Sequence, residues 1–411
     1  MTIYVFSLLV GYEVSGVDNA QGYRDNFLKK TAYDRKYIFT QIPQEEYIEI
    51  YNNLGIKTED MLSAHLMLAG QYDFSGNYKV SDKLKELEDV YGNIEILQSD
   101  RYIRVFCNNK RIAAIYLKEN KDYLWRVEFY ESERLIATEH YSDKIMYRDY
   151  YSTIREDGRV YAKKTRISFF DPLGNIAYEC ICKDDGTDDV YVFSDGGRYN
   201  ISELLEMFIH KLELKKEDII LIDRPSSATY VQPLFKTEHK ARIMPFLHSN
   251  HYFELNESNT AVYLNYEYYY WFKYSDRIDT FLVSTEEQKI DLQDKLEMYN
   301  CHVPNIEVLF TGALKEIKVP DVGRKCNSII TVSRLNARKK IDWIILSVIK
   351  AHRQKTEIYL DIYGDGEQEY INYIKKIIVD NNAEDYIHLK GHCDVNDIYK
   401  NYELYVSASL W

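Results

Sequence analysis

Two cations follow an apolar run in the segment "TVSRLNARKKIDW", residues 331–343. The run predicts a buried strand that ends before Arg334, and Lys339 follows where the next helix is expected to begin. A nucleoside diphosphate that leaves a sugar gains negative charge on its bridging oxygen as the bond breaks. Two cations fixed near a helix N-terminus stabilise that charge without a metal ion. Arg334 and Lys339 are therefore candidate catalytic residues, although "RKK" is also typical of a solvated charged face.

A second candidate segment, "GYEVSGVDNAQGYR" at residues 11–24, follows the first apolar run of the chain. Ser15 and Asp18 have the spacing of a capping box, which predicts a helix that begins near Gly16. Because Gly16 lacks a Cβ atom, a diphosphate can approach the exposed N–H groups of that helix end. The alternative is an ordinary strand-to-helix turn with a serine cap, since a single pair of glycines is a weak sign of phosphate binding.

His248 lies in a third segment, "LHSNHYF", at the end of a predicted strand. It can bond to a sugar hydroxyl, through its side chain or its backbone, or simply pack in the core. The turn "YGDGE" places Gly364 and Gly366 after another strand, but it does not match the G-x-G-x-x-G pattern of dinucleotide-binding proteins.

Alternating strands and helices must position these residues. Such alternation is typical of parallel sheets built from βαβ crossovers. In the first part of the chain we expect strands at 3–10, 219–223, 242–248 and 280–284, with helices at 201–212 and 285–299. A second parallel set is expected to begin near residue 306. Its predicted strands are 328–333, 357–364, 386–391 and 403–408, and its predicted helices are 341–352, 367–380 and 394–401.

Short alternating runs separated by turns interrupt this pattern from about 95 to 200. The predicted strands are 102–107, 111–117, 123–130, 134–141, 159–170, 176–182 and 189–193. In "LWRVEFY", Trp125, Val127 and Phe129 face one way and the charged residues between them face the other, which indicates a sheet with one wet side. We therefore predict an inserted antiparallel meander at 76–200, an N-terminal Rossmann-like domain at 1–75 and 201–300, and a second one at 301–411.

Composition narrows the classes of partner and the cellular location. The net charge of −13 argues against nucleic acid or an anionic membrane as the main partner, because both bind a basic face. The N-terminus has no basic region typical of a signal peptide, and no apolar run is long enough to span a bilayer. We expect a cytoplasmic protein, and peripheral contact with the inner face of the membrane stays open.

The six cysteines are expected to be reduced and structural. In the strand that contains Cys180 and Cys182, we expect the two thiols to point to opposite faces, which suits neither a metal chelate nor a redox pair. No metal site is predicted.

Taken together, "SRLNARKK", "LDIYGDGE", "IHLKGH" and "YELYVSAS" resemble, in order and spacing, the retaining GT-B glycosyltransferases of family 4. With "SGVDNAQGYR", the meander, "LHSNHYF", "YSDRIDTFLVSTEEQ" and "ARKKIDW", the chain is most similar to the catalytic A subunits of the accessory Sec O-GlcNAc transferases. The resemblance implies an α/β fold of the GT-B type, with two Rossmann-like domains facing a cleft and an inserted β-meander.

The resemblance also implies a function. Such enzymes move GlcNAc from UDP-GlcNAc to Ser/Thr hydroxyls of serine-rich repeat adhesins, need no metal cofactor, and work with a homologous non-catalytic B subunit. It assigns Arg334 and Lys339 to the diphosphate, and it assigns to the donor a larger set: Ser15, Gly16, His248, Gly364, Gly366, Gly391 and His392. The alternatives are a non-catalytic adhesin-binding subunit and a GT-B transferase that acts on teichoic acid or another cell-surface glycan.

In this family, the strand that matches "YVSAS" leads into carboxylates that bind the donor sugar and the ribose. We therefore expect those carboxylates to follow Trp411, outside the present sequence, and we expect the 411-residue chain alone to be inactive.

Overall fold

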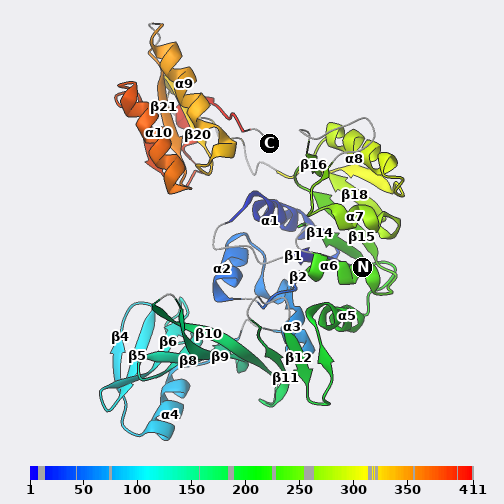
Figure 1. Ribbon diagram of the computed structural model, residues 1–411, viewed down its shortest axis with the longest axis vertical. Coiled ribbons are helices and arrows are strands. Elements are labelled where there is room, and N and C mark those ends of the chain that lie inside the picture. Colours follow the sequence, from blue (N-terminus) through cyan, green and yellow to red (C-terminus); the bar gives the residue numbers. More distant parts are fainter. Residues whose placement is uncertain are drawn as a thin grey trace. The chain divides into compact units, whose positions relative to one another are not determined.

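The chain forms two compact units, Met1–Ala313 and Leu314–Trp411, in the computed structural model (Figure 1). The structure describes residues 1–7, 14–42, 44–73, 76–156, 158–183, 189–224, 228–253, 263–312, 317, 319, 323–354, 357–395 and 397–409. Residues 8–13, which end the predicted strand 3–10 and begin the segment 11–24, lie outside the described residues, as does Trp411.

A seven-stranded parallel sheet forms the centre of the first unit, in the order β19-β18-β15-β14-β1-β2-β3. The strands are β1 (Thr2–Ser7), β2 (Asp34–Phe39), β3 (Met61–Ser63), β14 (Ile219–Ile222), β15 (Arg242–Leu247), β18 (Thr280–Val283) and β19 (Asn305–Val308). This is a Rossmann-like order in which the chain changes direction across the sheet between β1 and β14. Val5, Ile38 and Ile220 are fully buried, as expected for parallel strands covered on both faces.

Helices and short segments cover this sheet. They are α1 (Gly16–Leu28), α2 (Glu45–Asn53), η1 (Thr58–Asp60), α3 (Ala64–Leu68), α5 (Ile201–Lys211), α6 (Ala228–Lys236), β16 (Tyr252–Phe253), β17 (Tyr263–Leu264), α7 (Tyr269–Lys273), η3 (Ser275–Arg277) and α8 (Glu286–Met298). The predicted helices at 201–212 and 285–299 are confirmed as α5 and α8. However, β19 pairs with β18 of this sheet, so the second parallel set begins at residue 325 rather than near 306.

A ten-stranded antiparallel sheet is inserted between β3 and β14, and its strands run in the order β13 to β4 without a crossover. They are β4 (Glu95–Gln98), β5 (Tyr102–Cys107), β6 (Lys110–Leu117), β7 (Leu124–Glu131), β8 (Arg134–Tyr141), β9 (Ile145–Glu156), β10 (Arg159–Phe170), β11 (Ile176–Ile181), β12 (Val190–Phe193) and β13 (Arg198–Tyr199). The predicted meander is confirmed, and all seven predicted strands are present. The sequence analysis missed β9, whose charged and aromatic residues hide its alternation.

The meander buries opposite faces at its two ends. Val127, which is fully buried, belongs to a separate core that α4 (Val80–Tyr91) covers. Its neighbour Arg126 lies on the other face, in the same cross-strand row as Tyr147 and Phe169. Those two aromatic residues pack into the core of the Rossmann-like sheet. The prediction of one wet face is wrong, because the two ends bury opposite faces and Ser168, in the same cross-strand row as Val127, is also fully buried. Trp125 packs against the core of the parallel sheet rather than with Val127, so the inserted sheet shares that core.

The second unit contains a four-stranded parallel sheet in the order β22-β21-β20-β23, packed against two helices. Its elements are β20 (Lys325–Val332), η4 (Ala337–Lys339), α9 (Ile341–His352), β21 (Tyr359–Tyr363), α10 (Gln368–Asp380), β22 (Ile387–Gly391), η5 (Tyr399–Asn401) and β23 (Tyr402–Tyr405). The predicted helix at 341–352 is confirmed. The predicted helix at 394–401 is wrong, because the described part of that segment forms only the turn η5.

The six cysteines are all free thiols. The prediction that Cys180 and Cys182 point to opposite faces is wrong, because alternate residues of a strand share one face. The two sulfurs and a carboxylate oxygen of Asp189 lie within 4.8 Å of one another. Among the described residues, no helix is long and apolar enough to cross a membrane.

Candidate active site

The carboxyl edge of the first parallel sheet brings together the segments that follow β1, β14 and β15. Ligands of open parallel sheets bind outside the carboxyl ends of the strands, where the strand order reverses. Here that point lies between β1 and β14, which are hydrogen-bonded neighbours. The segment after β1 carries Ser15 and Gly16, the segment after β14 carries Asp223, and the residue after β15 is His248.

Ser15 caps α1 through a reciprocal pair of hydrogen bonds. Its backbone N–H donates to Asp18 Oδ2 at 2.8 Å, and the Asp18 N–H donates to Ser15 Oγ at 3.3 Å. The guanidinium of Arg224 donates to Ser15 Oγ at 2.6 Å and pairs with Asp18 Oδ1 at 2.8 Å. The predicted capping box is confirmed, and Arg224 neutralises the carboxylate that would otherwise repel an anion at this helix end.

Gly16 is the first residue of α1, as predicted. A Cβ atom built at this position would meet no atom of the described residues within 4 Å. The packing of the protein therefore does not require glycine here, and the space over the helix end is open to a ligand. Its assignment to the donor phosphates stays a prediction.

Asp223 contacts two side chains on the same edge. Its carboxylate has no exposed surface, pairs with the guanidinium of Arg24 and lies 3.4 Å from Nε2 of His248. Burial alone would raise the pKa of Asp223, but the charge of Arg24 and the hydrogen bond to His248 outweigh it and lower that pKa. The His248 ring stacks on Phe246, with the ring centroids 4.2 Å apart. The side chain of His248 is therefore held in place, and only 11% of it is exposed.

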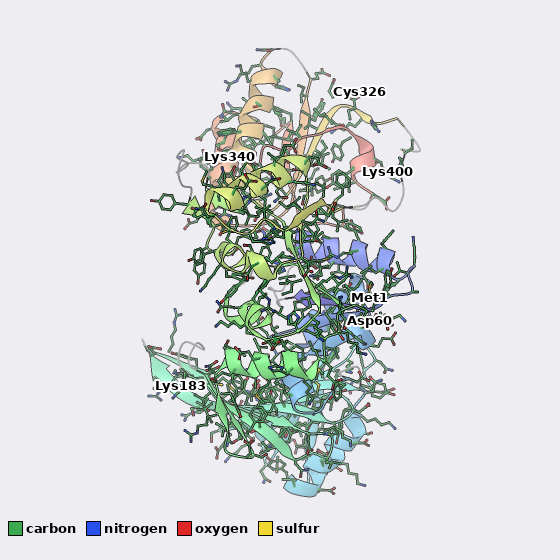
Figure 2. All side chains as sticks on the ribbon, turned by 90° about the vertical axis from the view of Figure 1, so that its right-hand side faces the viewer. Met1, Asp60, Lys183, Cys326, Lys340 and Lys400 are labelled. Carbon is green, nitrogen blue, oxygen red and sulfur yellow. The ribbon has the colours of Figure 1, made fainter. Side chains whose placement is uncertain are left out.

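The second unit presents its cations on the loop between β20 and α9. Arg334 is exposed and Lys339 is half-buried in the turn η4, directly before α9 (Figure 2 labels the next residue, Lys340). The sequence prediction that these residues lie between the end of a strand and the start of a helix is confirmed. Their catalytic roles stay a prediction.

Two glycines hold that loop against the loop that follows β21. A Cβ atom on Gly364 would lie 1.9 Å from the carbonyl oxygen of Ser333, and one on Gly366 would lie 2.2 Å from that of Leu335. The Leu335 N–H also donates to the Asp365 carbonyl at 2.9 Å. Close approach of the two backbones therefore explains both glycines, and it fixes the position of the loop that carries Arg334. Contact of these glycines with the donor stays a prediction.

Gly391 ends β22 with a φ of +73°, and a Cβ atom there would meet none of the described atoms within 4 Å. His392 follows it and is exposed. Gly391 therefore resembles Gly16 in having open space above it, whereas Gly364 and Gly366 are packed. The structure brings Gly364, Gly391 and the β20–α9 loop to the same edge, since the Gly364 N–H donates to the Gly391 carbonyl at 2.9 Å.

Sequence reasoning missed Arg24, Asp223 and Arg224. Arg24 and Asp223 are 199 residues apart in the sequence, and Arg224 and Asp18 are 206 apart. The available signal was "IILIDR", an acid and a base directly after a buried strand at the carboxyl edge of a parallel sheet. That position favours a ligand-facing role.

Comparisons with known proteins agree with this architecture. Residues 95–195 match the family described as the GtfA extended beta-sheet domain, and residues 326–411 match glycosyl transferases group 1. A curated relative from Streptococcus parasanguinis, the UDP-N-acetylglucosamine–peptide N-acetylglucosaminyltransferase GtfA subunit, is 32% identical over all of this chain and 80% of its own length. The chain belongs to the GtfA family.

Solved structures of the GtfA family have the same fold. The pneumococcal O-GlcNAc transferase GtfA in complex with UDP and GlcNAc is 29% identical, with a TM-score of 0.84 over 100% of this chain and 79% of that chain. A GtfA/B complex gives a TM-score of 0.85 at 29% identity, over 100% of this chain and 80% of that chain. The predicted fold class is confirmed: two Rossmann-like sheets of a GT-B glycosyltransferase and an inserted antiparallel sheet.

Proposed function

We propose that the protein is a glycosyltransferase subunit that moves GlcNAc from UDP-GlcNAc to Ser or Thr hydroxyls of a polypeptide. The similarity over the full chain to UDP-GlcNAc–peptide transferase subunits carries this proposal. The cationic loop at the carboxyl edge of the second sheet supports it, because a departing UDP needs positive charge there.

Arg334 and Lys339 bind the diphosphate and stabilise the negative charge that grows as the sugar leaves. Lys339 precedes the N-terminus of α9, and the dipole of that helix adds to the positive potential. Two side-chain cations and a helix end supply the charge that a bound metal supplies in other nucleotide-sugar enzymes, so we propose that transfer needs no metal. Gly391 and His392, on the same edge, contact the nucleotide, and Gly364 and Gly366 hold the binding loop.

In the first unit, the open space over Gly16 admits the donor phosphates to the N-terminus of α1. His248, held by Asp223 and by stacking on Phe246, donates to or accepts from a sugar hydroxyl. A sugar offers uncharged hydroxyl groups. A side chain of fixed orientation binds them at a smaller entropy cost than a mobile charged side chain would.

The acceptor in this proposal is a serine-rich repeat adhesin, glycosylated in the cytoplasm before export. The partner is a homologous B subunit, as in the GtfA/B complex formed by a family member. The inserted sheet is the surface offered to the partner and the polypeptide.

The test of function is radiolabel transfer from UDP-GlcNAc to a serine-rich peptide by the protein co-expressed with its partner subunit. Arg334→Ala should lower the rate about 100- to 1,000-fold, because it removes one donor to the developing charge. The matched control is Arg338→Ala, an exposed arginine in the same turn that we assign no role. Transfer by Arg334→Ala at the rate of the control would overturn the assigned mechanism.

Calorimetry with UDP-GlcNAc tests the same proposal at the binding step. Measurable binding that Lys339→Ala weakens supports a transferase. If the complete protein with its partner binds no donor, a non-catalytic adhesin-binding subunit is the better description.

Substitutions of increasing size at Gly16 test whether the donor phosphates approach the carboxyl edge of the first sheet. Since a Cβ atom at Gly16 meets no atom in the part of the chain that the structure describes, Gly16→Ala and Gly16→Leu should leave the unfolding midpoint nearly unchanged. The KM for UDP-GlcNAc should rise with side-chain size if phosphates approach this helix end. A KM that stays the same in Gly16→Leu would exclude that approach.

A further inference from the structure

Three metal-ligating side chains meet in the hairpin of β11 and β12, at one end of the inserted sheet. The sulfurs of Cys180 and Cys182 and a carboxylate oxygen of Asp189 lie within 4.8 Å of one another. Cys180 is 1% exposed, and the other two are half-buried. Lys183, labelled in Figure 2, directly follows the second cysteine.

Strand pairing explains why these residues meet. Ile181 pairs with Val190, so Cys182 and Asp189 stand opposite each other at the next position of the ladder. Cys180 is two residues before Cys182 and therefore shares its face. The antiparallel ladder thus places two thiols and one carboxylate on a single face.

The backbone fixes both sides of the cluster. The Cys182 N–H donates to the Thr165 carbonyl of β10 at 3.0 Å. The Lys183 N–H donates to Asp189 Oδ1 at 2.7 Å. The ligand atoms are therefore carried by a backbone that is hydrogen-bonded on each side, which lowers the entropy cost of bringing them together around an ion.

The two thiols already interact. Their mutual hydrogen bond lowers the pKa of Cys182 and, together with burial, raises the pKa of Cys180. The charge of Asp189 raises the pKa of Cys182, and the smaller effects of Lys164 and Asp149 from neighbouring strands oppose each other.

We propose that Cys180, Cys182 and Asp189 bind a zinc ion. Two thiolates and a carboxylate are ligands that zinc accepts, and three protein ligands leave a fourth position for water. Zn–S bonds of about 2.3 Å place tetrahedral ligand atoms about 3.8 Å apart, so the cluster needs only a small contraction. The thiol protons pass to solvent when the ion binds.

The site would clamp the hairpin where the inserted sheet packs against α3. Tyr178 and Tyr191, which flank Cys180 along and across the ladder, pack around His65 of α3. A bound ion would therefore stabilise this contact and would take no part in sugar transfer, so the proposal does not depend on the proposed function.

The experiment titrates Co²⁺ as a spectroscopic probe for zinc into the reduced, metal-free 411-residue chain. The wild type should bind one equivalent with a thiolate-to-cobalt charge-transfer band, which Zn²⁺ then removes. Cys182→Ser should lose the band. Asp189→Asn, which keeps the shape of the side chain, should weaken binding by about tenfold or more. The control Cys326→Ser, which removes an exposed thiol of β20, should bind as the wild type does.

Thermal unfolding with Zn²⁺ gives a second readout, which should show stabilisation of the wild type and of Cys326→Ser but not of Cys182→Ser. Far-ultraviolet circular dichroism establishes that each variant is folded. Absence of the band in the wild type, or a band that persists in folded Cys182→Ser, would overturn the proposal. Zinc stabilisation of Asp189→Asn equal to that of the wild type would remove the carboxylate from the site.

Discussion

The carboxyl edges of the two parallel sheets handle charge in different ways. On the first edge, charged side chains are buried and paired with one another: Asp223 with Arg24 and His248, and Asp18 with Arg224. On the second edge, Arg334 is exposed and Lys339 is half-buried. The first edge is held by side-chain ion pairs, whereas the loop of the second is held by backbone contacts at glycines.

This difference suits two tasks. On the first edge, the paired charges hold His248 in one orientation, which favours recognition of sugar hydroxyls, and the helix end at Gly16 stays open for phosphate. On the second edge, the two cations lie on a loop of fixed position and provide a field for a diphosphate. Single substitutions can test this difference, because each removes an interaction that holds one edge, or the contact between the inserted sheet and α3, in place.

The variant with the largest expected effect is Asp223→Asn. It leaves Arg24 and His248 facing a buried neutral amide, and loss of one partner of a buried ion pair costs about 4 kcal/mol. We expect the urea midpoint of the first unit to fall accordingly. Asp100→Asn is the control, because its pair with Lys121 is exposed, screened by solvent, and should contribute little to stability. Equal effects of the two variants would mean that the first edge does not depend on its ion pairs.

Gly364→Ala tests the backbone contacts of the second edge. The new Cβ atom would lie 1.9 Å from the Ser333 carbonyl oxygen, at a φ of +132° that disfavours alanine. Backbone strain and overpacking together should lower the free energy of unfolding of this unit by about 3 kcal/mol. Donor affinity should fall as well, because the loop that carries Arg334 must move.

Gly391→Ala is the matched control for that variant. Its φ of +73° also disfavours alanine, but the space above it is open, so it should cost only about 1 kcal/mol of strain. If Gly364→Ala were no worse than Gly391→Ala in urea unfolding, close backbone approach would not be what holds the loop.

The sequence predicts the second edge better than the first. Arg334 and Lys339 can be placed from local pattern alone, because an apolar strand and a helix start flank them. The role of Gly364 is not visible in the sequence, since its contact is with the loop after another strand. The partners of Asp223 and Asp18 come from segments about 200 residues away, and a single sequence carries no signal for such pairs.

The inserted sheet shows a second limit of prediction from sequence. Alternation reveals that a strand has two unlike faces, but it does not say which face is buried, and Val127 and Tyr147 are buried on opposite faces. The C-x-C prediction failed for a simpler reason. Residues two apart in a strand share a face, so the spacing favoured a shared site from the beginning.

The stability of the contact between the inserted sheet and α3, which contains His65, should fall in acid. Burial lowers the pKa of His65 to about 4, while an unperturbed histidine titrates near 6.5. Between these values the unfolded chain binds a proton that the folded chain does not. Stability is therefore complete above about pH 6.5 and falls as the pH decreases toward 4, by about 2 kcal/mol between pH 7 and pH 5.

Urea unfolding at pH 7 and pH 5 measures this effect. Burial, followed by the charge of Lys295, lowers the pKa of His251 to about 4 as well, and burial also lowers the pKa of His239, so other histidines of the first unit contribute in the same direction. His65→Gln should therefore remove one of these contributions and reduce the pH dependence of the first unit. An unchanged slope in that variant would show that His65 is not buried in its neutral form at this contact.

The smallest expected effect is that of Ser15→Ala, which separates a capping role from a donor-binding role. The hydroxyl of Ser15 donates to Asp18 at 2.7 Å and accepts from Arg224 at 2.6 Å, so the cap already uses it. Loss of the cap should cost about 1 kcal/mol, and Ser15→Gly should cost only a few tenths of that. Because the phosphates are expected over Gly16, the KM for UDP-GlcNAc should change less in Ser15→Ala than in Gly16→Leu. A rise in KM as large as that of Gly16→Leu, with an unchanged unfolding midpoint, would instead place the donor directly on the serine hydroxyl.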